Sequence, residues 1–405
     1  MYRKKIIDFT DKNKSFIWGL FLSTIIFKFA VANVFLGILI LIFIIQLDQS
    51  RKINFQKSLF PLLVYFFWGL LSFIWTTDLL KTIKGIEATA PFIVIPILIS
   101  QYSDFEINDL TKTIKFFSTA LLLYFFICLV NASLLFLNDG QINHFFYHKL
   151  TSVNDNNAIY ISLAVAICIL INFNLSIKAI KDYLIILILG LFLLLLSSKN
   201  IIITTFSLIV LSMFLNKKNL KNTALSFLTP LLLFLFIMLY DNPIKERFLK
   251  ELNINLNFVL HGQDFYNYNF SGFEVRLFQW RIMNEMIVNN QVGLLGLGLN
   301  NVNYLIEQYF NYYNLYKGYF HLNFHNQYFQ TIGELGFIGL LLLIVIYFIS
   351  FYYALIKNNI YKIVIIILFF SAFFTESFLS RQKGVFLFVT IFSIMHKVTE
   401  QKKLK

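Results

Sequence analysis

Residues 323–350 read NFHNQYFQTIGELGFIGLLLLIVIYFIS, a polar stretch that runs directly into an apolar segment whose one charged residue is Glu334. About 20 consecutive, predominantly apolar residues can cross a bilayer as one helix. Polar groups that face hydrocarbon are costly, so the side-chain amides and His325 at the start of this segment are expected to face protein or water. The stretch therefore predicts a transmembrane helix that begins at a site with a use for polar groups.

The composition indicates the class of protein. Of the 405 residues, 58% are hydrophobic, 18% aromatic and only 14% charged, and the mean hydropathy is +0.70. A soluble chain of this length needs far more charge to cover its surface, so we expect an all-α polytopic membrane protein surrounded by membrane lipids. The net charge of +13 lies in short basic clusters between apolar runs, which is typical of cytoplasmic loops and does not indicate a nucleic-acid partner.

Apolar runs of about 15 to 25 residues predict about twelve transmembrane helices. The runs are 16–31, 34–47, 59–75, 85–100, 116–138, 157–173, 183–198, 200–215, 223–241, 331–356, 360–378 and 384–396. The predicted organisation is helices 1–9 in residues 1–241, a large loop in 242–330, and helices 10–12 with a tail in 331–405.

The positions of lysine and arginine predict the orientation. The N-terminal segment and the connections on its side carry most of the basic residues, and the opposite short connections carry few. Because basic residues favour cytoplasmic loops, both termini are expected in the cytoplasm and the loop 242–330 outside it.

This orientation brings ionisable residues that are remote in the sequence to the outer face. They are Lys199, Arg276, Arg281, His325, Glu376 and Arg381. Such a group predicts a functional site at this face. Simpler interpretations also fit: the arginines could reach lipid headgroups, His325 could cap a helix, and Glu376 could form a loop salt bridge with Arg381.

Two further patterns lie near this group. Asn326, Gln330 and Glu334 repeat every four residues and predict a polar stripe on one helix face. Gly333, Gly336 and Gly339 are most simply a small-residue face for close helix packing. The glycines of GLLGLGLNN, 293–301, allow a tight turn or a close approach of the backbone to a ligand.

The sequence does not indicate a metal site. His321 and His325 are four residues apart, as are His144 and His148, but neither pair has a third ligand or the glutamate of a zincin. The chain also lacks an Asp-x-Asp motif, which many glycosyltransferases use to hold a divalent ion on a nucleotide sugar. We expect no metal and no cofactor.

The pattern VRLFQW, GLLGLGLNN and HNQYFQTIGELGFIGLL resembles the signature of the O-antigen ligase family and the related Wzy-type polymerases. The matching residues are Arg276, Trp280, Gly296, Gly298, His325, Asn326, Glu334, Gly336 and Gly339. One position departs from the family: a Ser-Arg pair is frequent before helix eight, and here it is Ser198-Lys199. Lysine keeps the charge and loses the bidentate geometry of arginine.

The resemblance implies a GT-C-like glycosyltransferase of the bacterial inner membrane with a periplasmic active site. The donor would be a glycan on undecaprenyl pyrophosphate and the acceptor a hydroxyl of the lipid A–core oligosaccharide. His325 would act on the hydroxyl and Arg276 on the pyrophosphate, with Glu334 or Glu376 orienting the imidazole. The substrate-binding residues would be Lys199, Trp280, Arg281, Asn326, Glu334, Glu376 and Arg381.

Three other functions remain open from the sequence. A Wzy-type polymerase or a protein O-oligosaccharyltransferase would use the same donor and much the same site. A transporter of lipid-linked sugars predicts repeated halves and ionisable residues at the bilayer midplane. The sequence has no evident internal repeat and its charges cluster at the outer edge, so the transporter is disfavoured.

Overall fold

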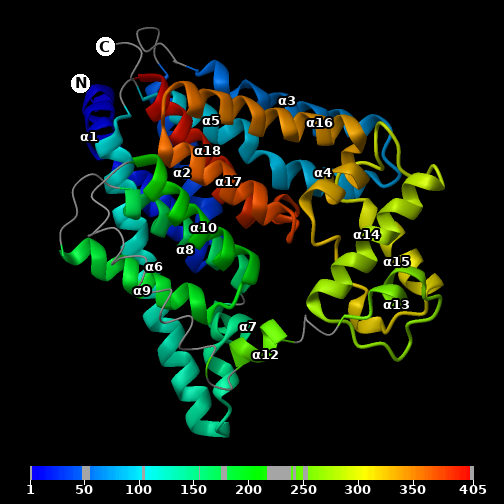
Figure 1. The fold of residues 1–405 in the computed structure, drawn as a ribbon. Coiled ribbons are helices and arrows are strands. Elements are labelled where there is room, and N and C mark those ends of the chain that lie inside the picture. Colours follow the sequence, from blue (N-terminus) through cyan, green and yellow to red (C-terminus); the bar gives the residue numbers. More distant parts are fainter. Residues whose placement is uncertain are drawn as a thin grey trace.

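The computed structural model describes residues 2–47, 55–102, 105–154, 156–174, 180–216, 239, 243–249 and 254–401, and all regular elements in these ranges are helices (Figure 1). The first group is α1 (Tyr2–Phe27), α2 (Phe29–Gln46), α3 (Phe60–Leu71), α4 (Leu79–Thr89), α5 (Pro91–Ser100), α6 (Ile107–Asp139), α7 (Tyr147–Leu150), α8 (Ala158–Asn174), α9 (Ile180–Leu195) and α10 (Lys199–Asn216). The second is α12 (Pro243–Leu249), α13 (Leu256–His261), α14 (Gly272–Val288), α15 (Val302–Tyr312), α16 (Gln327–Ile356), α17 (Ile360–Phe373) and α18 (Gln382–Gln401).

Most of the predicted apolar runs fall on one helix or on two consecutive helices. The first run, 16–31, crosses the end of α1 at Phe27, so the boundary between the first two predicted spans lies a few residues earlier than expected. Within the described residues, four helical segments are long and apolar enough to cross a membrane: Lys57–Ile74, Leu79–Ser100, Ile107–Asp139 and Gln327–Ile356. Shorter apolar helices cover Ala30–Gln46, Ala158–Asn174, Lys199–Leu215 and Ile360–Phe373. The predicted run 223–241 lies outside the described residues apart from position 239, so the count of about twelve spans stays a prediction.

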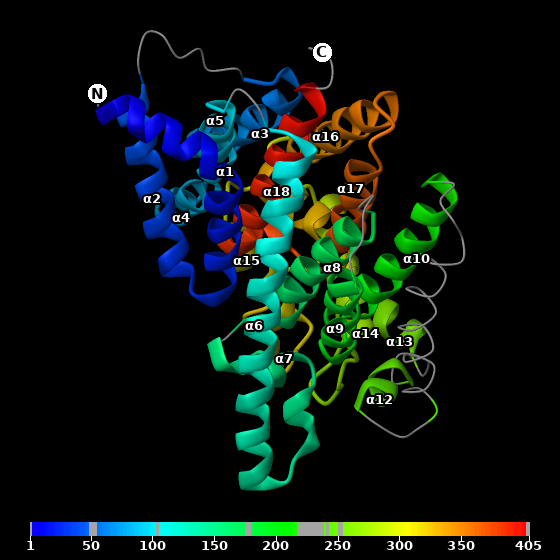
Figure 2. The ribbon, with the colours of Figure 1, turned by 90° about the vertical axis from the view of Figure 1, so that its left-hand side faces the viewer.

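The outer surface of these helices is apolar. Leu41 on α2, Phe126 on α6 and Phe348 on α16 are each more than half exposed, although each is a large hydrophobic side chain. Extended apolar surface of this kind is costly in water and stable against lipid tails. The helices therefore form a membrane protein. Tyr2 at the start of α1 and the end of α18 lie at the same end of the molecule (Figures 1 and 2).

Helices α13, α14 and α15 form a separate packed unit beside α4 and the N-terminal part of α16 (Figure 1). We call residues 254–322 the loop unit. Its core is buried and aromatic, with Phe265, Phe278 and Phe310 each about 1% exposed. The unit thus has a hydrophobic core of its own, which explains why a polar segment between two apolar runs folds.

Helix α16 is broken at Gly336. Its φ of 69° and ψ of −171° lie outside the helical region, in a conformation that essentially only glycine adopts. A side chain here would also collide with the carbonyl of Leu294. The sequence suggested helix packing for this glycine, and the structure gives it a second role as the point where the helix changes course.

The loop unit and its connection to α16 satisfy the backbone groups that the break leaves unpaired. Residues 293–298 run along the broken helix and form four backbone hydrogen bonds with it: Leu297 N to Gly333 O (2.9 Å), Gly298 N to Glu334 O (2.8 Å), Phe337 N to Gly293 O (3.2 Å) and Ile338 N to Leu294 O (3.3 Å). The indole of Trp68 donates to the Leu335 carbonyl at 3.0 Å. Unpaired backbone groups cost several kcal/mol at membrane depth, so these contacts allow the break.

Gly336→Ala is expected to destabilise the protein by more than about 2 kcal/mol, because alanine disfavours this φ/ψ region and its Cβ meets backbone atoms that cannot move aside. Thermal unfolding of the detergent-solubilised protein measures the loss. The matched control is Gly37→Ala in α2, where a Cβ meets nothing within 4 Å and alanine favours the helix. Equal midpoints for the two variants would contradict the assigned role of Gly336.

Candidate functional site

The start of α16 is fastened to the turn between α17 and α18, residues 375–381, here called the α17–α18 turn. The Asn326 backbone N–H donates to Ser377 Oγ at 3.2 Å, and the Gln327 side chain accepts from the Leu379 N–H at 2.7 Å. Asn326 also caps α16, because its Oδ1 accepts from two backbone N–H groups of the first turn. The predicted polar groups at the mouth of this helix therefore join two chain segments.

The side chains of His325 and Glu376 lie within hydrogen-bond distance of each other at the same place. His325 Nδ1 lies 3.2 Å from Glu376 Oε2, and the Glu376 side chain is buried. An ionised carboxylate only accepts hydrogen bonds, so this contact favours the proton on Nδ1 and leaves the lone pair of Nε2 available. Of the two acids that the sequence offered to orient the imidazole, the structure brings Glu376 to it.

The backbone of His325 is unusual. Its φ is +44°, a region that few non-glycine residues occupy, although histidine is among those enriched there. The conformation is held by Asn323, whose side chain accepts from the His325 N–H at 3.0 Å and whose carbonyl accepts from Gln279 of α14. Backbone strain that is stabilised by its surroundings is common at functional sites.

Arg276 of α14 reaches the same turn. Its Nε donates to the Thr375 carbonyl at 3.1 Å, and its Nη1 donates to the Gly272 carbonyl at 2.8 Å. These contacts are to neutral carbonyls, so they orient the guanidinium without neutralising its charge. Arg276, His325 and Glu376 are distant in sequence, and all three meet at the α17–α18 turn.

The N-terminus of α10 is tied to this turn as well. Asn200 donates to the Ser371 carbonyl at 2.8 Å and to Thr375 Oγ1 at 3.0 Å. Lys199, the first residue of α10, directly precedes Asn200 and is thus placed beside the turn. Sequence reasoning singled out Lys199 and missed Asn200, whose side chain makes the connection.

Arg281 and Glu334 lie elsewhere. Arg281 is held inside the loop unit by Glu285, by the Val259 and Gly262 carbonyls, and by the Tyr313 hydroxyl. Burial and a hydrogen bond donated to Glu285 raise the pKa of Tyr313 to about 12. Glu334 accepts from Gln330 at 2.7 Å near the break in α16. These contacts give both residues a structural role, and their predicted part in substrate binding stays a prediction.

The predicted polar stripe has a structural explanation. Asn326 caps α16, and Gln330 bonds to Glu334. Trp280, also a predicted site residue, packs edge to face on Phe329 of α16 with ring centroids 5.7 Å apart. Within the described residues the buried indole N–H of Trp280 has no acceptor. Trp280 thus connects α14 with α16, whereas these contacts of the stripe lie within α16.

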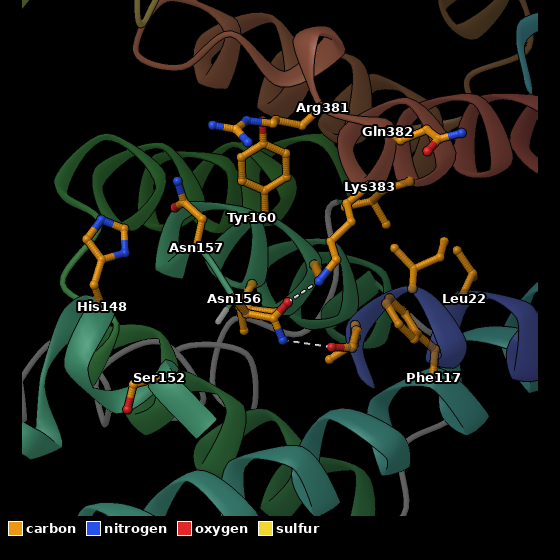
Figure 3. Close-up of a pocket in the computed structure, with 15 residues that line it drawn as sticks. Leu22, Phe117, His148, Ser152, Asn156, Asn157, Tyr160, Arg381, Gln382 and Lys383 are labelled. Carbon is orange, nitrogen blue, oxygen red and sulfur yellow. Dashed lines mark hydrogen bonds between the residues drawn. The ribbon is translucent and has the colours of Figure 1, made fainter. Parts of the chain in front are cut away.

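Arg381 is exposed at the edge of a cavity of about 740 Å³. Figure 3 shows its guanidinium beside Tyr160 and Asn157, while Lys383 points to Asn156. The Tyr160 hydroxyl donates to the Ser377 carbonyl at 3.4 Å, so the cavity borders the α17–α18 turn. Sequence reasoning did not single out Tyr160 or Lys383; Lys383 was visible only as a second cation two residues after Arg381.

Among the described residues, no three His, Cys, Asp or Glu side chains gather as a set of metal ligands. The cationic groups around the α17–α18 turn are instead arginine and lysine, which bind phosphate oxygens directly. A bundle of apolar helices with a polar cluster at the ends of several of them fits a helical membrane protein.

Comparison with known families agrees with this arrangement. Residues 184–344 match the family model described as O-antigen ligase. This match supports the family resemblance that the sequence analysis found, and that family suggests an enzyme of the glycosyltransferase type. The chain matches no curated protein. The matched range includes Lys199, Arg276 and His325, whereas Glu376 and Arg381 lie beyond it.

The helix that carries Arg276 depends on one carboxylate. Glu274 and Ser271 form a capping box at the start of α14, and Glu274 also accepts from the Tyr268 hydroxyl at 2.6 Å and the Asn255 N–H at 3.2 Å. Burial alone would raise the pKa of Glu274, but these hydrogen bonds outweigh it and lower the pKa. Glu274 therefore stabilises the loop unit above its unfolded pKa of about 4.3, and this contribution is lost as pH falls through the lower folded value.

Glu274→Gln is expected to lower the free energy of local unfolding of the loop unit by about 1–3 kcal/mol at pH 7, because charge-assisted hydrogen bonds are lost. The difference from wild type should shrink as pH falls below 4. Hydrogen exchange of peptides within 254–275, corrected for intrinsic rates, measures both effects. Glu307→Gln in α15 is the control, and equal protection in the two variants at pH 7 would contradict the role of Glu274.

Proposed function

We propose that this protein transfers a glycan from undecaprenyl pyrophosphate to a hydroxyl of the lipid A–core oligosaccharide, at the periplasmic face of the bacterial inner membrane. The observation that carries the proposal is the meeting of the His325–Glu376 pair with Arg276 at one turn. An imidazole with an available Nε2, an acid that orients it and a guanidinium nearby are the groups that such a transfer requires. The family match supports the general class of reaction.

The proposed reaction is a single displacement at the anomeric carbon. The acceptor hydroxyl oxygen forms a bond to that carbon, and the bond from the carbon to the pyrophosphate oxygen breaks. Nε2 of His325 takes the hydroxyl proton, and Glu376 stabilises the resulting imidazolium through Nδ1. The undecaprenyl pyrophosphate leaves with the electron pair and its negative charge.

Arg276 and Lys199 would stabilise the charge that develops on the leaving group. A guanidinium can donate two parallel hydrogen bonds to phosphate oxygens, and Arg276 uses only Nε and one Nη1 bond for its carbonyl contacts. Lys199 would add a point charge from the start of α10. In this proposal the pyrophosphate lies at the membrane surface and the undecaprenyl chain in the bilayer.

His325→Ala and His325→Asn are both expected to lower the rate of glycan transfer by a factor of about 100 or more, because the proton acceptor is lost. Asparagine tolerates a positive φ, so it separates loss of the imidazole from backbone strain. The measurement is a lipopolysaccharide gel of a deletion strain complemented with each variant. If the protein is a ligase, loss of its activity leaves bare core, with polymer accumulated on the carrier lipid. If it is a polymerase, loss of its activity leaves core that carries a single repeat unit.

The matched control is His321→Ala, four residues earlier, at an exposed position of the loop unit. It should restore polymer-capped core at the wild-type level. Equal amounts of each variant in the membrane are needed for the comparison. Polymer-capped core with His325→Asn would remove His325 from the reaction.

Arg276→Lys is expected to lower the transfer rate by roughly tenfold to a hundredfold, because lysine keeps the charge but cannot form the bidentate contact. The rate is measured with purified protein, a lipid-linked glycan and lipid A–core, at matched protein concentration. The thermal midpoint serves as a control for folding. A wild-type rate would mean that Arg276 supports the α17–α18 turn and does not bind the leaving group.

A further inference from the structure

Gln279 of α14 is a polar residue in the core of the loop unit. Its side chain is 0% exposed, and its neighbour in the chain, Phe278, belongs to that core. Its Nε2 donates a hydrogen bond to the Asn323 carbonyl. Within the described residues, its Oε1 is buried and has no hydrogen-bond donor. A buried acceptor without a donor is destabilising, so core packing alone does not explain a glutamine at this position.

The surroundings of Gln279 favour an apolar side chain. Val275, Phe278, Phe310 and Leu315 line the same small space inside the loop unit, and all four are apolar. A methionine or leucine here would contact them without placing a polar atom among them. The hydrogen bond to the Asn323 carbonyl is therefore the contact that requires an amide at this position.

The hydrogen bond from Gln279 leads to His325. Gln279 holds the carbonyl of Asn323, and the side-chain Oδ1 of Asn323 accepts from the His325 N–H at 3.0 Å. Phe324, which lies between them in the chain, is 0% exposed in the same core. On the other side of His325, the N–H of Asn326 is held by the α17–α18 turn. The peptide groups before and after His325 are thus both held.

These contacts determine where the imidazole points. The φ of His325 is +44°, a conformation that few non-glycine residues adopt without support from their surroundings. When the preceding peptide group is fixed, rotation about φ moves Cβ and the imidazole with it. A change of φ would therefore carry Nδ1 away from Glu376 Oε2, which lies 3.2 Å from it.

We propose that Gln279 is a positioning residue for glycan transfer, because its N–H fixes Asn323 and, through Asn323, the backbone of His325. The proposal rests on the proposed function, in which Nε2 of His325 takes the proton of the acceptor hydroxyl. Gln279 is fully buried, so its amide acts through His325 and does not touch the substrate. Loss of its hydrogen bond should slow proton transfer and leave substrate binding nearly unchanged.

Two substitutions separate the hydrogen bond from the shape of the side chain. Gln279→Met keeps a similar length and removes the donor. Gln279→Glu has a donor only when its carboxyl is protonated, because an ionised carboxylate only accepts hydrogen bonds. Burial favours the neutral carboxyl, so this variant is expected to change from donor to acceptor between about pH 5 and pH 8.

The rate of transfer is measured across this pH range with purified protein, a lipid-linked glycan and lipid A–core. Gln279→Met is expected to lower kcat about tenfold or more, while KM changes by less than about twofold. Each rate is compared with that of the wild type at the same pH. Gln279→Glu should approach the wild-type kcat at the low end of the range and the kcat of Gln279→Met at the high end.

The matched controls are Gln308→Met and Gln308→Glu in α15, because Gln308 is exposed on the same loop unit. Both should keep the wild-type kcat at every pH. Thermal midpoints of all variants are compared first. If Gln279→Met fails to fold, the pH dependence of Gln279→Glu decides.

Hydrogen exchange of the His325 N–H tests the contact without any transfer reaction. Gln279→Met should raise the exchange rate of peptides that contain this amide about threefold or more, because the Asn323 side chain that accepts from it is no longer held. Gln308→Met should leave this rate unchanged.

A low kcat of Gln279→Met, recovered in Gln279→Glu as the pH falls, supports the positioning role. A wild-type kcat of Gln279→Met, a relative kcat of Gln279→Glu that does not rise as the pH falls, or unchanged exchange at His325 overturns it. A wild type that transfers no glycan contradicts the proposed function instead. Faster exchange in Gln279→Met would then still show that Gln279 holds the backbone of His325.

Discussion

The break in α16 at Gly336 is the constraint on which the site depends. A helix in hydrocarbon normally satisfies its own backbone, and a break exposes carbonyl and N–H groups that only another chain segment can satisfy. Residues 293–298 supply these partners. The loop unit is therefore bound to the membrane helices through their main chains, and the side chains that it carries keep fixed positions relative to them.

This attachment brings the two halves of the site together. α14 of the loop unit carries Arg276 and Gln279, and these reach the Thr375 and Asn323 carbonyls on the membrane side. His325 lies between the loop unit and α16, and its positive φ is the conformation that joins them. A loop bound only by side-chain contacts would leave the distance from guanidinium to imidazole free to vary.

Hydropathy predicted the helices because long apolar runs have one stable structure in lipid, and the basic clusters predicted an orientation. The sequence also singled out Arg276, His325 and Glu376. It did not reveal which acid meets His325, because Glu334 has the closer spacing to His325 and only the packing of α17 brings Glu376 there. The role of Gly336 was not predictable either, because a glycine in a helix can serve close packing or a break in the helix. The contacts that decide between these roles come from residues 293–298, about 40 positions earlier in the chain. Arg281 shows the opposite error: the sequence predicted a site residue here, but the hydrogen-bond partners of its guanidinium lie in the loop unit.

The α17–α18 turn contacts a different neighbour at almost every position: the Thr375 carbonyl meets α14, Glu376 meets His325, Ser377 meets both α16 and α8, and Arg381 reaches the cavity. Because one short segment makes all these contacts, a shift of its backbone would move the partner of the imidazole, the acceptor of the Arg276 guanidinium and the start of α16 together.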